Sequence, residues 1–196
     1  MKTPLRERSA VCSAAARRLC RLPKQLFFAK WTRPATFVRV SGYKSDGARE
    51  IEFSMSIVRV LIVDDFDPWR AFVVQHLNEQ PHFRILGCAP DGLEGLQKAE
   101  ELQPDLILLD ISLPKLNGIE LARKVRKLVP KAKILFLSSS ADPDVVRAAF
   151  CAGGAGYVLK SDAGGALLPG MEAVLLGKQF VSRSLSGIQD LTASAE

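Results

Sequence analysis

Five short apolar runs alternate with amphipathic stretches along the chain, and this alternation most narrows the fold that the chain can adopt. The runs lie at residues 58–63, 83–88, 106–109, 134–137 and 157–159. All but the second are nearly continuous in apolar residues, as expected for strands buried on both faces. Five such strands separated by helices predict an α/β domain, doubly wound around a five-stranded parallel sheet.

Helix signals fill the intervals between the apolar runs. Asp67 offers an N-cap and Pro68 a first helical residue, and apolar residues then recur at helical spacing. Asp91 and Glu94 form a capping-box pattern at the start of the second predicted helix. Three further helices are expected at residues 119–128, 142–152 and about 167–176.

Charge divides the chain into two unequal parts. Residues 1–54 hold 12 basic and 4 acidic residues, a net of +8, and residues 55–196 hold 15 basic and 17 acidic residues, a net of −2. Overall charge therefore gives little support to nucleic-acid binding by the predicted domain. We expect residues 1–54 to be a disordered basic extension. It is interpreted first as the product of an upstream start site, with Met55 as the natural start, and otherwise as an organelle transit peptide or a basic arm.

Cysteine and hydropathy patterns exclude several classes of protein. The four cysteines form no CxxC pair, and His76 and His82 lack metal-ligand spacing, which disfavours a disulfide scaffold and a structural zinc site. No run approaches 18 uninterrupted apolar residues, so the sequence contains no membrane-spanning helix. We expect a cytoplasmic protein without a membrane partner.

Polar residues follow four of the five predicted strands. Asp64 and Asp65 follow the first strand, Asp110 the third, Ser138 the fourth and Lys160 the fifth. The carboxyl ends of parallel strands lie at one edge of such a sheet, where ligands bind. Three carboxylates in one pocket repel each other. A hard divalent cation with oxygen ligands, such as Mg²⁺, is their natural partner.

This set of residues is sufficient for one kind of covalent chemistry. A carboxylate oxygen can attack a phosphoryl group whose charge the metal and Lys160 neutralise, and an aspartyl phosphate results. Asp110 is the best nucleophile candidate because it follows the most apolar run and so lies at the centre of the sheet.

From Met55 to about residue 184, the chain resembles the receiver domain of two-component response regulators, and in particular the NarL/FixJ branch. The resemblance rests on four segments in order, namely residues 61–65, 109–118, 135–138 and 156–160. It implies a flavodoxin-like (βα)5 fold with strand order 2-1-3-4-5. The receiver domain would span residues 55–178 and a tail residues 179–196.

The resemblance also implies a metal site. Asp110 would be the phosphorylated residue and a ligand of Mg²⁺. Asp65 would contact the ion directly, Asp64 through water, and Ser112 through its backbone carbonyl.

The remaining matched residues would convert phosphorylation into a conformational change. Ser138 would donate a hydrogen bond to the phosphoryl group, Lys160 would pair with it, and Tyr157 would rotate inward as Ser138 moves. The chain departs from a common receiver pattern at Ser161, where many receivers carry proline after the lysine.

The implied function is a phospho-accepting switch rather than a turnover enzyme. It would receive its phosphoryl group from a sensor histidine kinase or phosphotransfer protein and signal to a downstream protein, and a homodimer is left open. Residues 178–196 hold no three-helix pattern, so the chain resembles a receiver without an effector domain. The alternative is a DNA-binding regulator, either truncated or using the basic N-terminal extension.

Overall fold

The structure is a computed structural model that describes residues 57–185. In this part of the chain, one sheet contains six strands in the order β2-β1-β3-β4-β5-β6, and every neighbouring pair is parallel. The strands are β1 (Val58–Val63), β2 (Phe83–Ala89), β3 (Leu106–Asp110), β4 (Lys133–Ser138), β5 (Gly156–Leu159) and β6 (Phe180–Val181). The predicted α/β class and the order 2-1-3-4-5 are confirmed. The predicted extension at residues 1–54 lies outside the described residues.

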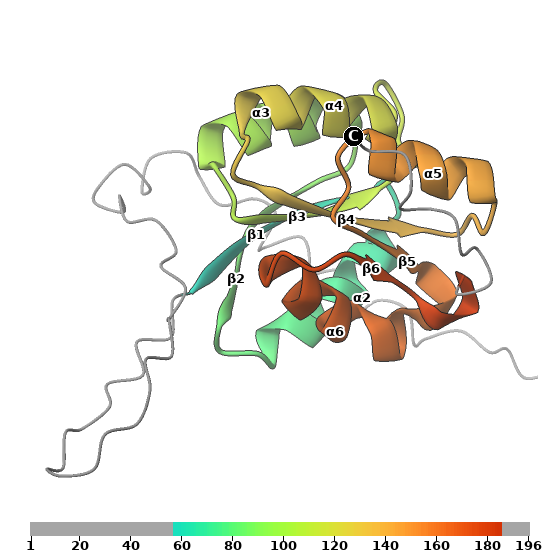
Figure 1. The fold of residues 1–196 in the computed structure, drawn as a ribbon. Coiled ribbons are helices and arrows are strands. Elements are labelled where there is room, and N and C mark those ends of the chain that lie inside the picture. The colour runs from blue at the N-terminus through green and yellow to red at the C-terminus, as the bar shows by residue number, and fades with distance from the viewer. Residues whose placement is uncertain (1–56, 186–196) are drawn as a thin grey trace, which may run out of the picture.

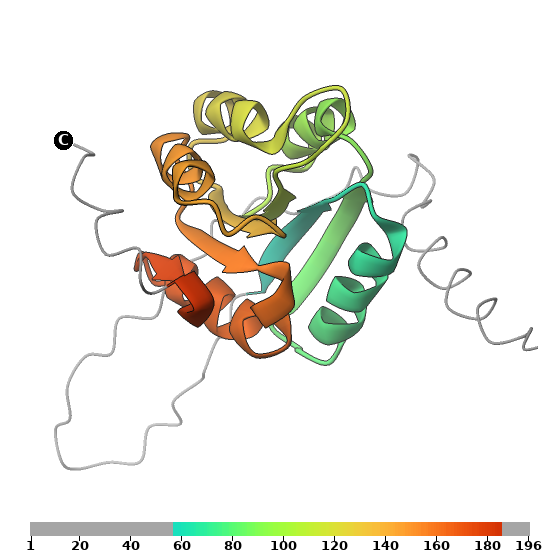
Figure 2. The same cartoon turned by 90° about the vertical axis from the view of Figure 1, so that its right-hand side faces the viewer.

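Helices cover both faces of the sheet (Figures 1 and 2). They are α2 (Asp67–Asn78), α3 (Gly92–Leu102), α4 (Gly118–Leu128), α5 (Pro143–Cys151) and α6 (Ala163–Leu175), with 3-10 turns η1 (Lys160–Asp162) and η2 (Arg183–Leu185). Helices α3, α4 and α5 lie on one face, and α2 and α6 on the other. Alternate residues of the central strands enter two separate apolar clusters, one under each helical layer. This burial on both faces explains the continuous apolar runs.

Two helix starts differ from the predictions. Asp67 is the first residue of α2 rather than its N-cap; Phe66 holds the cap position, and no side chain caps the helix there. Helix α6 begins at Ala163, four residues earlier than expected, and contains Pro169. The glycines in its first turn and the internal proline are poor helix formers, so the sequence gives no clear sign of this start. Leu167 and the other residues on the buried face of α6 nevertheless pack against the sheet. By contrast, Asp91 caps α3 by accepting from two backbone N–H groups, as its pattern predicts.

The chain after α6 adds a sixth strand that the sequence did not reveal. Gly177, with a φ of 76°, turns the chain back, and β6 then pairs with β5 in a register that sets Val181 beside Tyr157. Leu185 follows in η2 and is buried in the cluster beneath α4 and α5. The sheet therefore has six strands rather than the predicted five, and residues 180–181 of the expected tail belong to it. A two-residue strand is too short to show a periodicity.

Within residues 57–185, no helix combines the length and apolar character needed to cross a bilayer.

Candidate functional site

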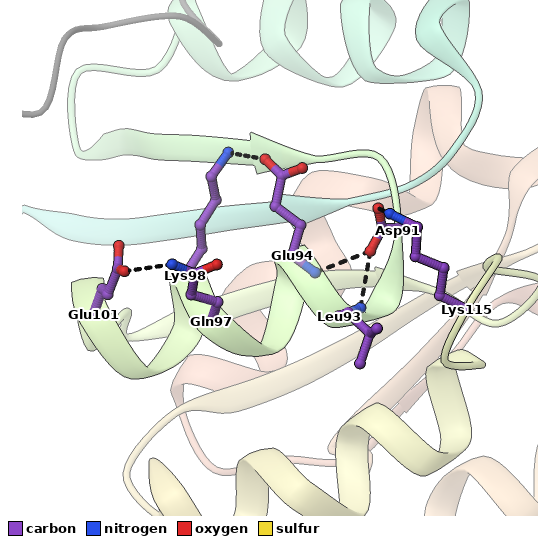
Figure 3. A pocket seen from close by; sticks show the side chains of 7 residues that line it. All are labelled: Asp91, Leu93, Glu94, Gln97, Lys98, Glu101 and Lys115. Carbon is purple, nitrogen blue, oxygen red and sulfur yellow. Dashed lines mark hydrogen bonds and ion pairs between the residues drawn. The ribbon is translucent and has the colours of Figure 1, made fainter.

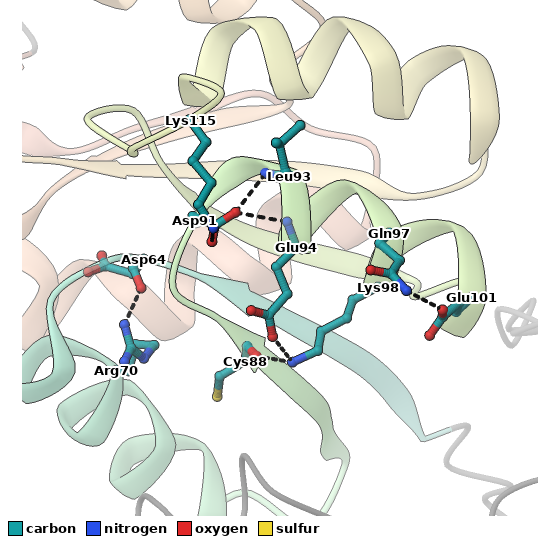
Figure 4. A network of polar contacts seen from close by, with 10 residues as sticks. All are labelled: Asp64, Arg70, Cys88, Asp91, Leu93, Glu94, Gln97, Lys98, Glu101 and Lys115. Carbon is teal, nitrogen blue, oxygen red and sulfur yellow. Dashed lines mark hydrogen bonds and ion pairs between the residues drawn. The ribbon is translucent and has the colours of Figure 1, made fainter. Parts of the chain in front are cut away.

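Asp64 lies at the carboxyl end of β1 and is almost completely buried, with 1% of its surface exposed. Its Oδ1 accepts a hydrogen bond of 2.9 Å from the Phe66 N–H. Its Oδ2 lies 2.6 Å from Nζ of Lys160 and has no well-aligned hydrogen-bond donor. The Arg70 guanidinium donates to the Asp64 backbone carbonyl and so ties the first turn of α2 to this strand end (Figure 4).

Asp110 ends the neighbouring central strand, β3, and is also buried. The backbone N–H of Ser112 donates to its Oδ2 at 2.9 Å, and its Oδ1 lies 3.1 Å from Nζ of Lys160. The ammonium of Lys160 therefore lies between the carboxylates of Asp64 and Asp110. Three of the residues predicted from the strand ends thus meet at one point.

Lys160 follows β5 and carries the positive charge of the site. Burial opposes that charge, but the two carboxylates outweigh burial and raise the pKa of Lys160. Burial also raises the pKa of Asp64, and this effect exceeds the lowering by the Lys160 ammonium and the Phe66 N–H. Two carboxylates around one ammonium leave a negative site once both are ionised. Such a site attracts a further cation.

Trp69, on the first turn of α2, closes one side of the site. Its ring centroid lies 5.4 Å from Nζ of Lys160, a cation–π distance. In the sequence, Trp69 lies just after the acidic pair and is among the apolar residues at helical spacing that follow Pro68. Nothing in the sequence indicated its contact with Lys160, which comes from a distant strand end.

Ser138 and Tyr157 are linked through one residue of the loop after β4. The hydroxyl of Ser138, buried at the end of β4, accepts from the Ser140 N–H at 3.1 Å. The Tyr157 hydroxyl donates to the Ser140 carbonyl at 2.8 Å, and the ring is fully buried. Burial raises the pKa of Tyr157. In this structure the tyrosine is therefore already turned inward.

Asp65 is exposed, unlike its neighbour Asp64. In the described part of the chain, no three His, Cys, Asp or Glu side chains converge as an ion site would require. Two of the three predicted carboxylates come together, and Ser112 lies beside them, bound to Asp110 through its N–H.

The residues present fit a magnesium ion. Mg²⁺ uses one or two carboxylates and keeps several waters. Asp64 supplies a buried carboxylate oxygen whose 2.6 Å contact with Nζ of Lys160 is not aligned as a hydrogen bond, and Asp110 supplies a second carboxylate beside the same ammonium.

The loop that follows Asp110 is held tightly by a glycine. A Cβ atom on Gly118 would lie 2.0 Å from the Asp110 backbone oxygen, so only glycine allows this approach. The Gly118 N–H also donates to the carbonyl of Ile111 at 2.9 Å. This packing gives the glycine of the 109–118 segment a structural reason.

A second anchor of the same loop was not predicted from the sequence. Lys115, with a φ of 66°, places its ammonium 2.5 Å from Oδ2 of Asp91, which caps α3 (Figure 3). The hydrogen bond from Lys115 lowers the pKa of Asp91, and the cap's backbone N–H groups add to this effect. The two residues are 24 positions apart and share no motif.

Comparison with known proteins identifies the family of the chain. Residues 60–168 match the response regulator receiver domain, and the chain belongs to this family. A solved LuxR-family two-component response regulator from Aurantimonas is 30% identical with a TM-score of 0.64, covering 67% of this chain and 94% of that one.

Two curated relatives are longer proteins of different kinds. The nitrate/nitrite response regulator protein NarL of Escherichia coli is 33% identical over 129 residues, which make up 66% of this chain and 60% of NarL. A protein-glutamate methylesterase/protein-glutamine glutaminase of Maricaulis maris is 39% identical over 111 residues, or 56% of this chain and 28% of that protein. The chain thus spans less than two thirds of the length of these relatives.

Proposed function

We propose that the chain receives a phosphoryl group on Asp110 from a histidine kinase or phosphotransfer protein. A carboxylate oxygen of Asp110 forms the new bond to phosphorus, and the bond from phosphorus to the donor histidine nitrogen breaks. The observation that supports this most is the position of Lys160 Nζ between Asp64 and Asp110, at 2.6 and 3.1 Å. Phosphoryl transfer depends mainly on such positioning and charge stabilisation.

The proposed reaction depends on Mg²⁺. Asp65 and Asp110 would contact the ion directly, Asp64 through water and Ser112 through its backbone carbonyl. When bound, the ion neutralises charge that develops on the phosphoryl oxygens. The Ser112 N–H orients the Asp110 carboxylate, and Lys160 pairs with the incoming group.

The proposed signal passes through the loop after β4. A phosphoryl group on Asp110 offers the Ser138 hydroxyl a charged acceptor, which is a stronger partner than a backbone group. Because Ser138 and Tyr157 both bind Ser140, a shift of Ser138 is transmitted to the tyrosine. The surface formed by α5, β5 and α6 would then change and dock on a downstream protein. On this proposal the chain is a switch rather than a turnover enzyme.

Intact mass spectrometry after incubation with acetyl phosphate tests the proposal. With Mg²⁺, the wild type should gain one phosphoryl group, and chelating the metal with EDTA should abolish the gain. Asp110→Ala should gain none. Asp144→Ala, which removes an exposed carboxylate on α5, serves as the matched control and should behave as the wild type. Equal phosphorylation of Asp110→Ala and wild type would refute the assignment.

A DNA-binding output is the second candidate. It is favoured by the net charge of +8 in residues 1–54 and by similarity to a LuxR-family regulator. The full chain and a chain starting at Met55 would be compared for binding to duplex DNA at several salt concentrations. Binding that needs residues 1–54 and weakens steeply with salt would support this output. Mapping the mature N-terminus by mass spectrometry shows whether that segment is present.

A further inference from the structure

The segment 180–185, which we call the C-terminal clasp, lies beyond the family match at residues 60–168 and alongside β5 (Figure 1). Its backbone extends the sheet through two hydrogen bonds. The Phe180 N–H donates to Ala155 at 3.3 Å, and the Ser182 N–H donates to the Tyr157 carbonyl at 3.0 Å. The clasp therefore contacts the strand that carries Tyr157 and leads into Lys160.

Where the backbone of the clasp leaves β5, the side chain of Ser182 makes the next hydrogen bond to that strand. Its hydroxyl oxygen accepts from the Leu159 N–H at 3.1 Å, and Ser182 is fully buried. A buried N–H without an acceptor is costly, and the Ser182 hydroxyl gives the Leu159 N–H an acceptor. Leu159 directly precedes Lys160, so the bond fixes the backbone at the base of the lysine.

The other end of the Lys160 turn is held by the same clasp. Asp162, the last residue of η1, accepts from the Ser184 hydroxyl at 2.9 Å and from the Ser184 N–H at 3.4 Å. The Ser184 hydroxyl, and with it the nearby Ser182 side chain, holds the pKa of Asp162 below its usual value. Lys160 thus lies between two residues that the clasp binds, Leu159 through its backbone N–H and Asp162 through its side-chain carboxylate.

Burial keeps the clasp docked on the sheet. Leu185, at its end, is 2% exposed and belongs to the apolar cluster that contains Tyr157 and Leu159. A lysine side chain has many rotamers, and a fixed backbone limits how far its ammonium can move. The ammonium of Lys160 is held 2.6 Å from Asp64 and 3.1 Å from Asp110.

We infer that Ser182 is a positioning residue of the phosphorylation site, and that Asp162 assists it. Through Leu159 and the η1 turn, the clasp sets the place of the Lys160 ammonium beside Asp110. The inference rests on the proposed function and deepens it, because it makes phosphoryl binding depend on residues beyond the family match.

Affinity for beryllofluoride, a phosphoryl mimic, tests the inference in the full chain with Mg²⁺. Trp69 reports on the site because its ring lies 5.4 Å from Nζ of Lys160, and Trp31→Phe removes the only other tryptophan. Ser182→Ala should bind about tenfold more weakly, which corresponds to about 1.4 kcal/mol, because the Lys160 ammonium is no longer held in place before the mimic binds. Ser182→Thr, which keeps the hydroxyl, should recover most of this loss.

Two further measurements separate positioning from general destabilisation. Ala99→Gly removes a buried methyl group from α3, which packs against β1 and β2 at the opposite edge of the sheet from the clasp, and it should lower stability without changing beryllofluoride affinity. Hydrogen exchange of the Leu159 N–H should speed up in Ser182→Ala more than that of other β5 amides. Should Ser182→Ala fail to fold, Asp162→Ala, at a partly exposed turn, should still weaken binding.

The outcomes separate the inference from the proposed function. Equal beryllofluoride affinity in wild type and Ser182→Ala overturns the inference and leaves the proposed function standing. An equal loss in Ala99→Gly and Ser182→Ala also overturns it, because the effect is then one of stability. A wild type that binds no beryllofluoride and gains no phosphoryl group overturns the proposed function, and the inference with it.

Discussion

At the scale of single residues, Lys160 determines the charge balance of the site. Its ammonium compensates two buried carboxylates, and its raised pKa keeps it charged at neutral pH. Without it, Asp64 and Asp110 would face each other with no cation from the protein. Removing one partner of a buried charge group leaves the others uncompensated, which is costly.

Lys160→Ala should therefore lose about a hundredfold in phosphorylation rate with acetyl phosphate, the usual scale for one preorganised charge contact. Lys131→Ala is the matched control and should keep the wild-type rate. It removes an exposed ammonium just before β4, at the opposite end of that strand from the site. Single-turnover mass spectrometry gives both rates. If the two variants reacted equally fast, Lys160 would have no role in the transfer.

At the scale of elements, two glycines lie in the first turn of a helix but have different surroundings. Gly118 begins α4 where the loop from Asp110 returns, and a Cβ atom there would overlap that loop. Gly164 lies in the first turn of α6, where a Cβ atom would meet nothing within 4 Å. The same substitution is thus expected to have opposite effects at the two positions.

Gly118→Ala should lower the free energy of unfolding by about 1–3 kcal/mol, the cost of overpacking, and should slow phosphorylation because the Asp110 loop must move. Gly164→Ala should raise it by about 0.5–1 kcal/mol, because alanine favours the helix. Urea unfolding measures both effects. A loss of stability in Gly164→Ala, or none in Gly118→Ala, would contradict this packing.

The sequence predicted most of the fold because each signal was local or repeated. Five apolar runs predict five strands, and the strand-end residues Asp64, Asp110 and Lys160 meet as expected. What remained hidden depends on contacts between distant segments. The exposure of Asp65, the Lys115–Asp91 pair and the position of Trp69 over Lys160 are set by tertiary packing, which no local pattern reports.

At the scale of the whole molecule, the clasp makes the sheet depend on residues that follow α6. A chain ending at residue 178 loses β6 and the burial of Leu185, and a chain ending at residue 185 keeps both. The shorter chain should be less stable by about 2–4 kcal/mol, the worth of one buried leucine and a few hydrogen bonds. Equal midpoints of urea unfolding for the two truncations would show that the clasp adds no stability.

The site of phosphorylation can be read directly by chemical trapping. Borohydride reduces an acyl phosphate to an alcohol, so a phosphorylated aspartate becomes homoserine at the modified position. The full chain would be incubated with acetyl phosphate and Mg²⁺, reduced, digested and sequenced by mass spectrometry. We expect homoserine at position 110 alone. Homoserine at position 64 or 65, or at no position in a folded protein, would contradict the assignment of Asp110 as the phosphoryl acceptor.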